Sequence, residues 1–154
     1  MEIERKFLIT TLPSPLSQYP SCPMVQGYLS FDPLVRIRKQ GGECYLTKKG
    51  KGHLIRTEEE QAISQQEYEQ LSAKVVSHLI YKTRYRIPLQ GGLVAELDVY
   101  EGRLSGLTVV EVEFPSLEAA ESFVKPSWFG EDVTFDKRYK NNNLSALDSL
   151  SDLS

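Results

Sequence analysis

Hydrophobic and polar residues alternate along most of this chain, a pattern typical of β-strands that bury one face. Gly- and Pro-containing stretches interrupt the alternation. The short connections at 40–43, 90–92 and 102–106 contain Gly and favour antiparallel hairpins. The pattern predicts eight strands, over residues 1–9, 25–31, 34–39, 44–49, 54–61, 80–88, 93–101 and 107–114.

Helices are predicted where apolar spacing and capping signals coincide. Ser64 and Glu67 form a capping box, which marks a helix start. The apolar residues that follow at three- and four-residue spacing are Tyr68, Leu71, Val75 and Leu79. A second helix is predicted after Ser116 and must end near Pro126, because proline breaks a helix interior. A short third helix is predicted around 144–150, in a tail (about 144–154) that we expect to be frayed.

Length and charge exclude several classes of protein. The 154 residues carry 18 Lys and Arg against 21 Asp and Glu, and they predict a single domain over 1–154. No apolar run approaches the roughly 18 residues that cross a bilayer, so we expect no membrane span. The acidic start at Met1 lacks the apolar region of a signal peptide, and we expect a cytoplasmic protein. The nearly balanced charge argues against DNA as a partner, while monomer and homodimer both remain open.

Cysteine and histidine contribute little to the expected chemistry. Cys22 and Cys44 are too few for a disulfide scaffold and lack metal-ligand spacing, so we expect two buried or half-buried thiols. His53 and His78 are isolated in the sequence and are expected to be surface or packing residues.

The charged residues of the predicted strands occupy alternate positions and therefore share one face. They come in blocks of like sign. The basic blocks include Arg36 with Arg38 and the run Lys82, Arg84, Arg86. The acidic blocks are Glu2 with Glu4, Glu58 with Glu60, Glu96 with Asp98, and Glu111 with Glu113.

Two structures are compatible with this pattern. One is a sheet with a solvated face laced with surface ion pairs. The other is an α+β protein built on an eight-stranded antiparallel closed β-barrel with a few flanking helices, whose charged interior holds one ionic ligand. Paired carboxylates suit Mg²⁺ or Mn²⁺, and clustered Arg and Lys suit phosphate oxygens. A polyphosphate bound with divalent metals satisfies both sets of charges.

The sequence resembles the CYTH family, also called triphosphate tunnel metalloenzymes. The E-x-E-x-K signature of that family is present as Glu2-Ile3-Glu4-Arg5-Lys6, and the remaining motifs follow in order over essentially the whole chain. They are Gln26-Gly27-Tyr28-Leu29, Val35-Arg36-Ile37-Arg38, Leu46-Thr47-Lys48, Arg56-Thr57-Glu58-Glu59-Glu60, Lys82-Thr83-Arg84-Tyr85-Arg86, Glu96-Leu97-Asp98, Glu111-Val112-Glu113 and Asp136-Lys137-Arg138-Tyr139-Lys140-Asn141. The resemblance implies a closed eight-stranded barrel whose polar tunnel binds a triphosphate with Mg²⁺ or Mn²⁺.

The resemblance also implies roles for individual residues. The implied metal ligands are Glu2, Glu4, Glu111 and Glu113, with Glu58, Glu60, Glu96 and Asp98 as further candidates. The implied triphosphate-binding residues are Lys6, Arg36, Arg38, Lys48, Arg56, Lys82, Arg84, Arg86 and Lys137. The implied catalytic residues are Lys6, Glu2, Glu4 and Lys82. Tyr139 is open between a core and a site position, and Gln26 and Tyr28 are expected in the wall.

Members of the family perform several reactions, so the resemblance leaves the substrate open. Hydrolysis of inorganic triphosphate is the preferred hypothesis, because the chain starts at the signature and shows no aromatic cluster that selects adenine or thiamine. The alternatives within the family are a class IV-type adenylate cyclase and a thiamine triphosphatase. A non-catalytic polyphosphate- or nucleotide-binding module and a purely structural, surface-charged barrel are the alternatives from other classes.

Overall fold

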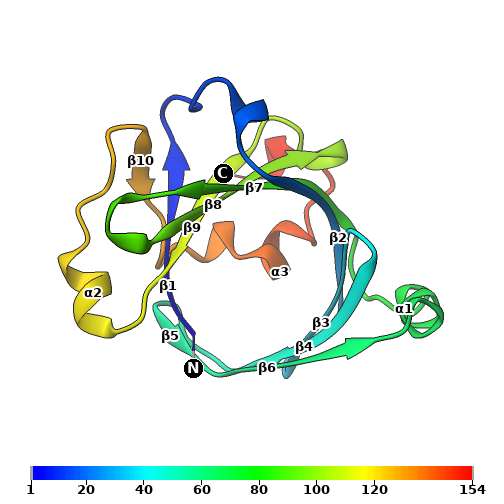
Figure 1. The fold of residues 1–154 in the computed structure, drawn as a ribbon. Helices are drawn as coiled ribbons and strands as arrows, with labels where there is room; N and C mark the ends of the chain where they lie inside the picture. The colour runs from blue at the N-terminus through cyan, green and yellow to red at the C-terminus, as the bar shows by residue number, and fades with distance from the viewer. Residues whose placement is uncertain (1, 154) are drawn as a thin grey trace.

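The computed structural model describes residues 2–153. It is dominated by one antiparallel sheet that curves around a central space (Figure 1). Its strands are β1 (Glu2–Ile9), β2 (Ser21–Phe31), β3 (Leu34–Gln40), β4 (Glu43–Lys49), β5 (Ile55–Arg56), β6 (Glu58–Ile63), β7 (Ile80–Pro88), β8 (Val94–Glu101), β9 (Thr108–Glu113) and β10 (Phe129–Asp132). Their order is β10-β1-β9-β8-β7-β2-β3-β4-β6, and β5 pairs with β1. The predicted α+β class and antiparallel arrangement are confirmed.

The predicted closed eight-stranded barrel is wrong, because the sheet has ten strands and does not close. The expected strand at 54–61 divides at Thr57. Arg56 before it pairs with Glu2 of β1, whereas Glu58 after it pairs with Lys49 of β4. Within residues 2–153 no ladder joins β6 to β1, so the curved sheet has two edges. The tenth strand, β10, is too short for alternation to predict it.

Strand β2 begins four residues earlier than predicted, at Ser21 instead of residue 25. The predicted strand began after Pro23, because proline lacks the backbone N–H that donates to a neighbouring strand. In the structure Pro23 lies just outside the β2–β3 pairing, which starts at Met24. On its other side it lies opposite Thr83 of β7.

The helices are short and lie around the sheet: α1 (Gln65–Ser72), α2 (Leu117–Ser122) and α3 (Asn141–Leu144). The capping box of α1 is confirmed, since the Ser64 hydroxyl accepts from the Glu67 N–H at 3.0 Å and the Glu67 carboxylate accepts from the Ser64 N–H at 3.1 Å. The helix ends before Val75 and Leu79, which instead lie over Gly27, where an added Cβ would approach Leu79 to 2.8 Å.

The C-terminal segment differs from the predicted helix over 144–150. It forms α3 earlier, and its later residues make a 3₁₀-helix over Leu150–Asp152. Further 3₁₀-helices span Leu16–Gln18, Gln90–Gly92, Gly102–Leu104 and Lys137–Tyr139. None of the helices in residues 2–153 combines the length and apolarity needed to cross a bilayer.

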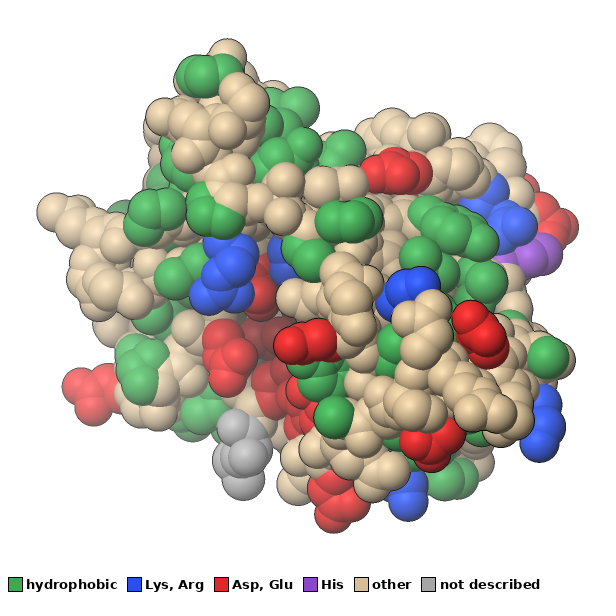
Figure 2. Space-filling model, turned by 45° about the vertical axis from the view of Figure 1, so that its right-hand side comes forward, with side chains coloured by type: hydrophobic (Ala, Val, Ile, Leu, Met, Phe, Trp, Pro, Cys, Tyr) green, Lys and Arg blue, Asp and Glu red, His purple; other side chains and the backbone are tan. Residues whose placement is uncertain are grey.

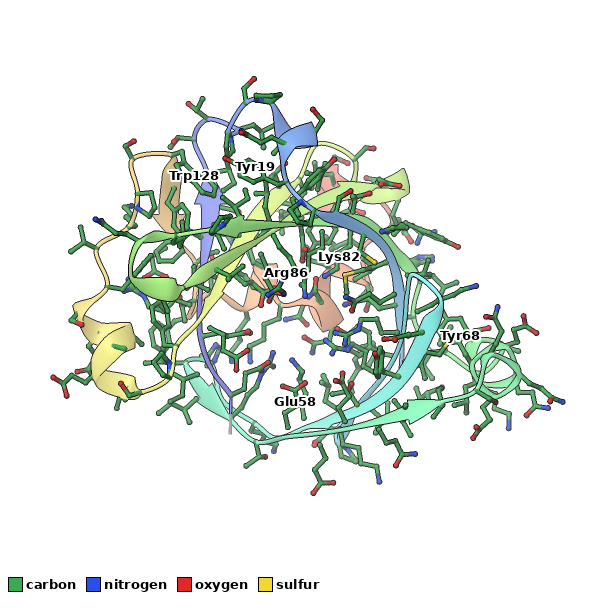
Figure 3. All side chains as sticks on the ribbon, viewed as in Figure 1. Tyr19, Glu58, Tyr68, Lys82, Arg86 and Trp128 are labelled. Carbon is green, nitrogen blue, oxygen red and sulfur yellow. The ribbon has the colours of Figure 1, made fainter. Side chains whose placement is uncertain are left out.

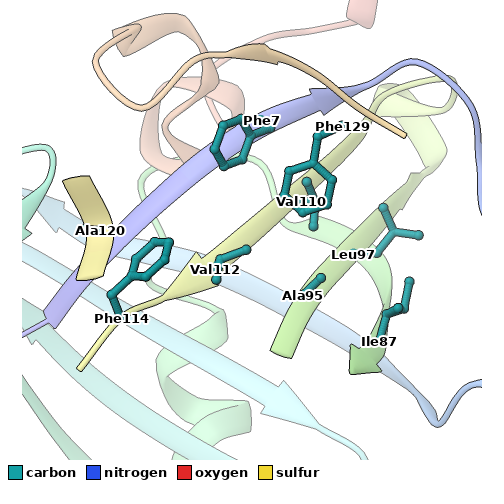
Figure 4. Close-up of a cluster of buried hydrophobic side chains, with 9 residues drawn as sticks. All are labelled: Phe7, Ile87, Ala95, Leu97, Val110, Val112, Phe114, Ala120 and Phe129. Atoms are coloured by element: carbon teal, nitrogen blue, oxygen red, sulfur yellow. The ribbon is translucent and has the colours of Figure 1, made fainter. Parts of the chain in front are cut away.

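The hydrophobic clusters lie mainly on the convex side of the sheet, away from the charged residues. The largest cluster packs against α2 and β10 (Figure 4), and its buried members are Phe7, Ile87, Ala95, Leu97, Val110, Val112, Phe114, Ala120 and Phe129. A smaller cluster under α1 contains Ile37, Cys44 and Tyr68. Cys22 and Cys44 are free thiols, the first half-buried and the second buried, as predicted. A further cluster includes Tyr100 and Val109, which lie directly opposite Lys82 and Asp98 and so share the concave side with the charged residues.

Candidate functional site

The concave side of the sheet encloses a charged cavity of about 200 Å³, called the central pocket below. Figure 2 shows acidic side chains gathered in a hollow of this face with basic side chains beside them. In Figure 3, Glu58, Lys82 and Arg86 point into the ring of strands, whereas Tyr68 and Trp128 lie outside it. The charged lining consists of Lys6, Arg36, Arg38, Lys49, Arg56, Arg84 and Lys140 with Glu2, Glu4, Glu58, Glu60, Glu96, Glu111 and Glu113.

Strands β7 and β8 contribute charges that neutralise one another. Lys82 Nζ donates to Asp98 Oδ2 at 2.8 Å, and both side chains are only 1% exposed. Arg84 donates to the same carboxylate from Nε at 2.7 Å and from Nη2 at 2.9 Å. Burial lowers the pKa of Lys82 to about 8, although Asp98 opposes that shift. Burial alone would raise the pKa of Asp98, but Arg84 and Lys82 outweigh it and hold that pKa below its usual value. These three residues form a closed ionic cluster, called the paired cluster below.

Strand β3 contributes two arginines whose donors are not used up. Arg36 is 7% exposed, and its Nε has no hydrogen-bond partner among the described residues. Arg38 donates from Nη2 to Glu60 at 3.0 Å, yet its buried Nε also lacks a partner. A buried donor without an acceptor is costly, typically 1–3 kcal/mol. Guanidinium forks that point into a cavity are suited to phosphate oxygens, which accept in the same planar geometry.

Like charges oppose one another across β1, β9 and β8. Glu4 lies directly opposite Glu113, and Glu111 lies directly opposite Glu96. Such pairs destabilise a sheet unless a cation or proton compensates them. Burial and the neighbouring carboxylates of Glu111 and Glu2 raise the pKa of Glu4 well above its ordinary value. Burial would also raise the pKa of Glu111, but Lys6, Arg84 and Lys82 lower it further than burial raises it. Of these facing acids, Glu4 is therefore the one whose neutral form is favoured, and Glu111 the one whose charged form is favoured.

Three other acids already have basic partners. Glu2 Oε1 accepts from Lys49 Nζ and from Arg56 Nε, each at 3.2 Å. Burial alone would raise the pKa of Glu2, but these cations hold it below its usual value. Glu60 accepts from both Arg38 and the buried Thr47. The third, Glu96, accepts from Arg86 at 3.0 Å.

Glu4 and Glu111 make only longer contacts with basic residues, 3.7 Å to Arg56 and 3.9 Å to Arg84. Together with Glu113 they could hold a hard divalent cation, because their carboxylates supply the oxygen donors that Mg²⁺ and Mn²⁺ prefer. Within residues 2–153, no three acidic, His or Cys side chains already stand in a metal-binding arrangement.

The C-terminal segment forms one wall of the central pocket. Lys6 Nζ donates to the Tyr139 carbonyl at 2.9 Å, and Lys140 Nζ donates to the Gly52 carbonyl at 2.8 Å. Asn141 and Asn142 also line the pocket. Since Lys6 belongs to β1, this segment joins both ends of the described chain at the site. Farther on, the exposed His78 meets Asp148 at 3.0 Å, as expected of a surface histidine.

The structure brings most of the predicted site residues together. Those that line the central pocket are Glu2, Glu4, Lys6, Arg36, Arg38, Arg56, Glu58, Glu60, Arg84, Glu96, Glu111 and Glu113. Lys82 and Asp98 lie behind the wall in the paired cluster, and Arg86 lies at one mouth, 56% exposed. Lys48 is exposed on the other face of β4, and Lys137 lies in a neighbouring pocket.

Sequence reasoning missed Lys49, Gln40, Lys140, Asn141 and Asn142, which line the central pocket. The alternation of β4 contained a signal for Lys49. Cys44 and Leu46 pack on the convex side, so Lys48 must share their face and Lys49 the opposite one. The residues 140–142 follow no periodic pattern; Lys140 and Asn141 belong to the last motif of the resemblance, which was the only sequence signal for them.

A curved antiparallel sheet with unused arginine donors and facing carboxylates on its concave side defines a polyanion site of the triphosphate-tunnel type. No protein-family model matches the chain. A curated inorganic triphosphatase from Nitrosomonas europaea is 46% identical over 147 residues, which covers 94% of this chain and 96% of the relative. A second, from Acetivibrio thermocellus, is 35% identical over 151 residues, with coverage of 93% and 92%. The chain belongs to the CYTH family of triphosphate tunnel metalloenzymes.

Solved structures agree with that assignment. The crystal structure of an inorganic triphosphatase superposes with a TM-score of 0.71 at 43% identity and covers 96% of this chain and 95% of its own. A Hippeastrum protein, for which a dominant triphosphatase activity is described, has a TM-score of 0.60 at 18% identity and covers 79% and 83%. At that identity the second likeness concerns the fold alone.

Proposed function

We propose that this protein hydrolyses inorganic triphosphate with the help of Mg²⁺ or Mn²⁺. The observation that carries the proposal is the pair of buried Arg36 and Arg38 Nε donors, which have no partner within residues 2–153 and face carboxylates across one cavity. A polyphosphate with a divalent cation satisfies both groups at once. The names of the two curated relatives support inorganic triphosphate as the substrate.

In this proposal the basic residues of the central pocket bind and orient the substrate. Arg36 and Arg38 take phosphate oxygens in their planar forks, and Lys6 holds a terminal phosphate from β1. Restricting the phosphate chain to one alignment supplies much of the catalysis in phosphoryl transfer. Of the paired cluster, Lys82 and Asp98 lie behind the pocket wall, and Asp98 holds Arg84 in place at the wall, where its guanidinium faces the substrate.

Glu4, Glu111 and Glu113 would hold the divalent cation. When bound, such a cation neutralises charge on phosphate oxygens and lowers the pKa of a coordinated water. A carboxylate must be ionised to bind a metal, so the raised pKa of Glu4 opposes cation binding at low pH.

The test is a substrate comparison with a matched variant pair. Inorganic triphosphate, thiamine triphosphate and ATP are each incubated with Mg²⁺, Mn²⁺ or EDTA, and phosphate and cyclic AMP are measured. We expect the fastest phosphate release from inorganic triphosphate, and none in EDTA. Cyclic AMP as the main product from ATP, or faster hydrolysis of thiamine triphosphate, would overturn the proposed substrate. Tight triphosphate binding without turnover under either metal would indicate a binding module instead.

The variants locate the acidic contribution. Glu111→Gln keeps the size of the side chain but removes its charge, and we expect metal-dependent hydrolysis to be lost while the circular dichroism spectrum stays unchanged. Glu59→Gln is the matched control, because Glu59 is exposed on β6 and does not line the central pocket. Equal activity in both variants would contradict the assignment of Glu111.

A further inference from the structure

A second pocket adjoins the central pocket where the β2–β3 turn, the loop after β4 and the C-terminal segment meet. Its volume is about 440 Å³, and it shares Lys49, Arg56 and Lys140 with the central pocket. Lys51 and Lys137 complete a set of five basic residues against a single acid, Asp32. We call this pocket the basic antechamber.

The pocket at the other side of the central pocket has the opposite character. It also measures about 440 Å³ and lies between the β7–β8 connection and the end of β9. Its charged lining is Arg86 with Glu96 and Glu113, and the two acids are shared with the central pocket. We call it the acidic mouth. The central pocket is thus flanked by one cationic opening and one with a slight acidic excess.

The positive charge of the basic antechamber is compensated only in part within the described chain, where Lys49 and Arg56 pair with Glu2. Burial lowers the pKa of Lys140, and the charges of Arg56, Lys6, Lys137 and Lys49 lower it further. Four cations acting on a fifth indicate a strong local positive potential. Neither Lys51 Nζ nor Lys137 Nζ forms a hydrogen bond or ion pair with any residue from 2 to 153.

The floor of the basic antechamber contains a further unused polar atom. His53 Nδ1 is buried without a hydrogen-bond partner among the described residues. Burial lowers the pKa of His53, with contributions from Lys140 and Lys137, so the ring is neutral near pH 7 and can donate to an anion without adding charge. Phe135 flanks it at 5.8 Å between ring centroids.

We propose that the basic antechamber captures inorganic polyphosphate and that the substrate enters the central pocket from this side. This inference rests on the proposed function and adds to it the side from which the substrate enters. A cluster of like charge at the opening of a cavity concentrates oppositely charged ligands and speeds their association. The acidic mouth disfavours a polyanion by the same physics. Lys49, Arg56 and Lys140 line both cavities and give the phosphates a continuous basic path.

The experiment measures how charge at the entrance affects substrate capture. Lys51→Glu and Lys51→Gln are compared with the matched control Lys74→Glu, since Lys74 is exposed beyond the end of α1 and lines neither pocket. We expect Lys51→Glu to lower kcat/KM for inorganic triphosphate roughly threefold to tenfold at low ionic strength through a higher KM, with a smaller effect for Lys51→Gln. The difference should shrink as salt is added.

A gain-of-charge variant tests the rival entrance. Pro115→Lys adds a positive charge at the exposed rim of the acidic mouth. We expect it to change kcat/KM less than Lys51→Glu does. A rise in kcat/KM for Pro115→Lys as large as the loss for Lys51→Glu would overturn the proposal. So would a Lys51→Glu effect no larger than that of Lys74→Glu, or one confined to kcat.

A binding measurement separates this inference from the proposed hydrolysis. Calorimetric titration with inorganic triphosphate in EDTA reports capture without turnover. If the protein binds triphosphate more weakly after Lys51→Glu, the antechamber has the inferred role even in a protein that hydrolyses nothing. Unchanged binding in that titration would refute the antechamber while leaving the hydrolysis result untouched.

Discussion

Strands β3 and β7 carry the same sequence pattern but hold their charges in opposite states. Each presents two basic residues, two positions apart, to the concave side: Arg36 and Arg38 on β3, and Lys82 and Arg84 on β7. On β7 both are bonded to Asp98 at 2.7–2.9 Å. On β3 both keep a buried Nε without a partner.

The register of the neighbouring strands explains the difference. Arg84 lies directly opposite Asp98 of β8, whereas Arg36 lies between Tyr28 of β2 and Thr47 of β4. Neutral neighbours leave Arg36 free for an anion, whereas Arg38 reaches Glu60 of β6 with Nη2 and keeps only its Nε unused among the described residues. The comparison shows that alternation identifies which residues face the pocket, but cross-strand register decides which of them remain available for a ligand.

The largest expected effect comes from opening the paired cluster. Asp98→Asn leaves Lys82 and Arg84 buried without their carboxylate, which should lower the free energy of unfolding by about 3–5 kcal/mol. Urea denaturation measures it. Asp136→Asn is the control, because the Asp136–Arg138 pair is largely solvent-accessible and worth at most about 1 kcal/mol. Equal losses in the two variants would show that burial of the cluster contributes nothing.

Removal of a β3 arginine should affect the ligand rather than the fold. Arg36→Met deletes a buried charge that has an unsatisfied donor, so stability should stay the same or increase. A charge-assisted hydrogen bond is worth about 1.5–3 kcal/mol, so kcat/KM for triphosphate should fall roughly 10- to 100-fold. Kinetics and thermal unfolding are measured together, with the exposed Arg103→Met as control. A clearly lower unfolding temperature for Arg36→Met would contradict this expectation, because it would mean that Arg36 stabilises the fold as Lys82 does.

The depressed pKa of Lys82 predicts a pH dependence of stability. Between about pH 8 and its ordinary value of 10.5, the unfolded chain holds this proton and the folded chain does not. Stability from this group therefore rises with pH over that window, by at most about 1.4 kcal/mol per pH unit, and is constant below it. Urea denaturation from pH 7 to 10.5 measures the slope. Lys82→Met should lack this rise, and an identical slope in both proteins would contradict the assignment.

The smallest effect is expected at the exposed end of β7. Arg86 pairs with Glu96 at 3.0 Å but is 56% exposed, so Arg86→Ala should lower the free energy of unfolding by no more than about 1 kcal/mol. Chemical denaturation beside Asp98→Asn gives the contrast within the β7–β8 pair. A loss of several kcal/mol would mean that burial does not control the energies of these pairs.

Alternation predicted the antiparallel strands and the face of every predicted site residue on them except Lys48, and the Ser64/Glu67 signature predicted the capping box of α1. Alternation could not predict whether the sheet closes, because closure depends on a single residue, Thr57. Before Thr57 the chain pairs with β1, and after it the chain pairs with β4. The strand β10 has too few residues to show a period.

The site was predictable as a set of charged residues but not as a set of partners. Lys82 and Arg36 have similar surroundings in sequence, and only three-dimensional pairing separates them. Lys48 was predicted from its motif. Alternation along β4 favoured Lys49, because Lys48 shares a face with the apolar Cys44 and Leu46. Lys140, Asn141 and Asn142 come from an aperiodic segment, whose position depends on long-range contacts such as that between Lys6 and Tyr139.

The placement of the largest apolar cluster on the convex side makes the central pocket open to redesign. In most proteins the residues that hold the fold together are also those at its centre, so a new pocket costs stability. Here Phe7, Val110 and Ile37 pack outside the sheet, while the central pocket contains few hydrophobic residues. A library that varies the inward positions of β3, β4 and β6, with the paired cluster kept, should therefore yield folded proteins with new anion preferences.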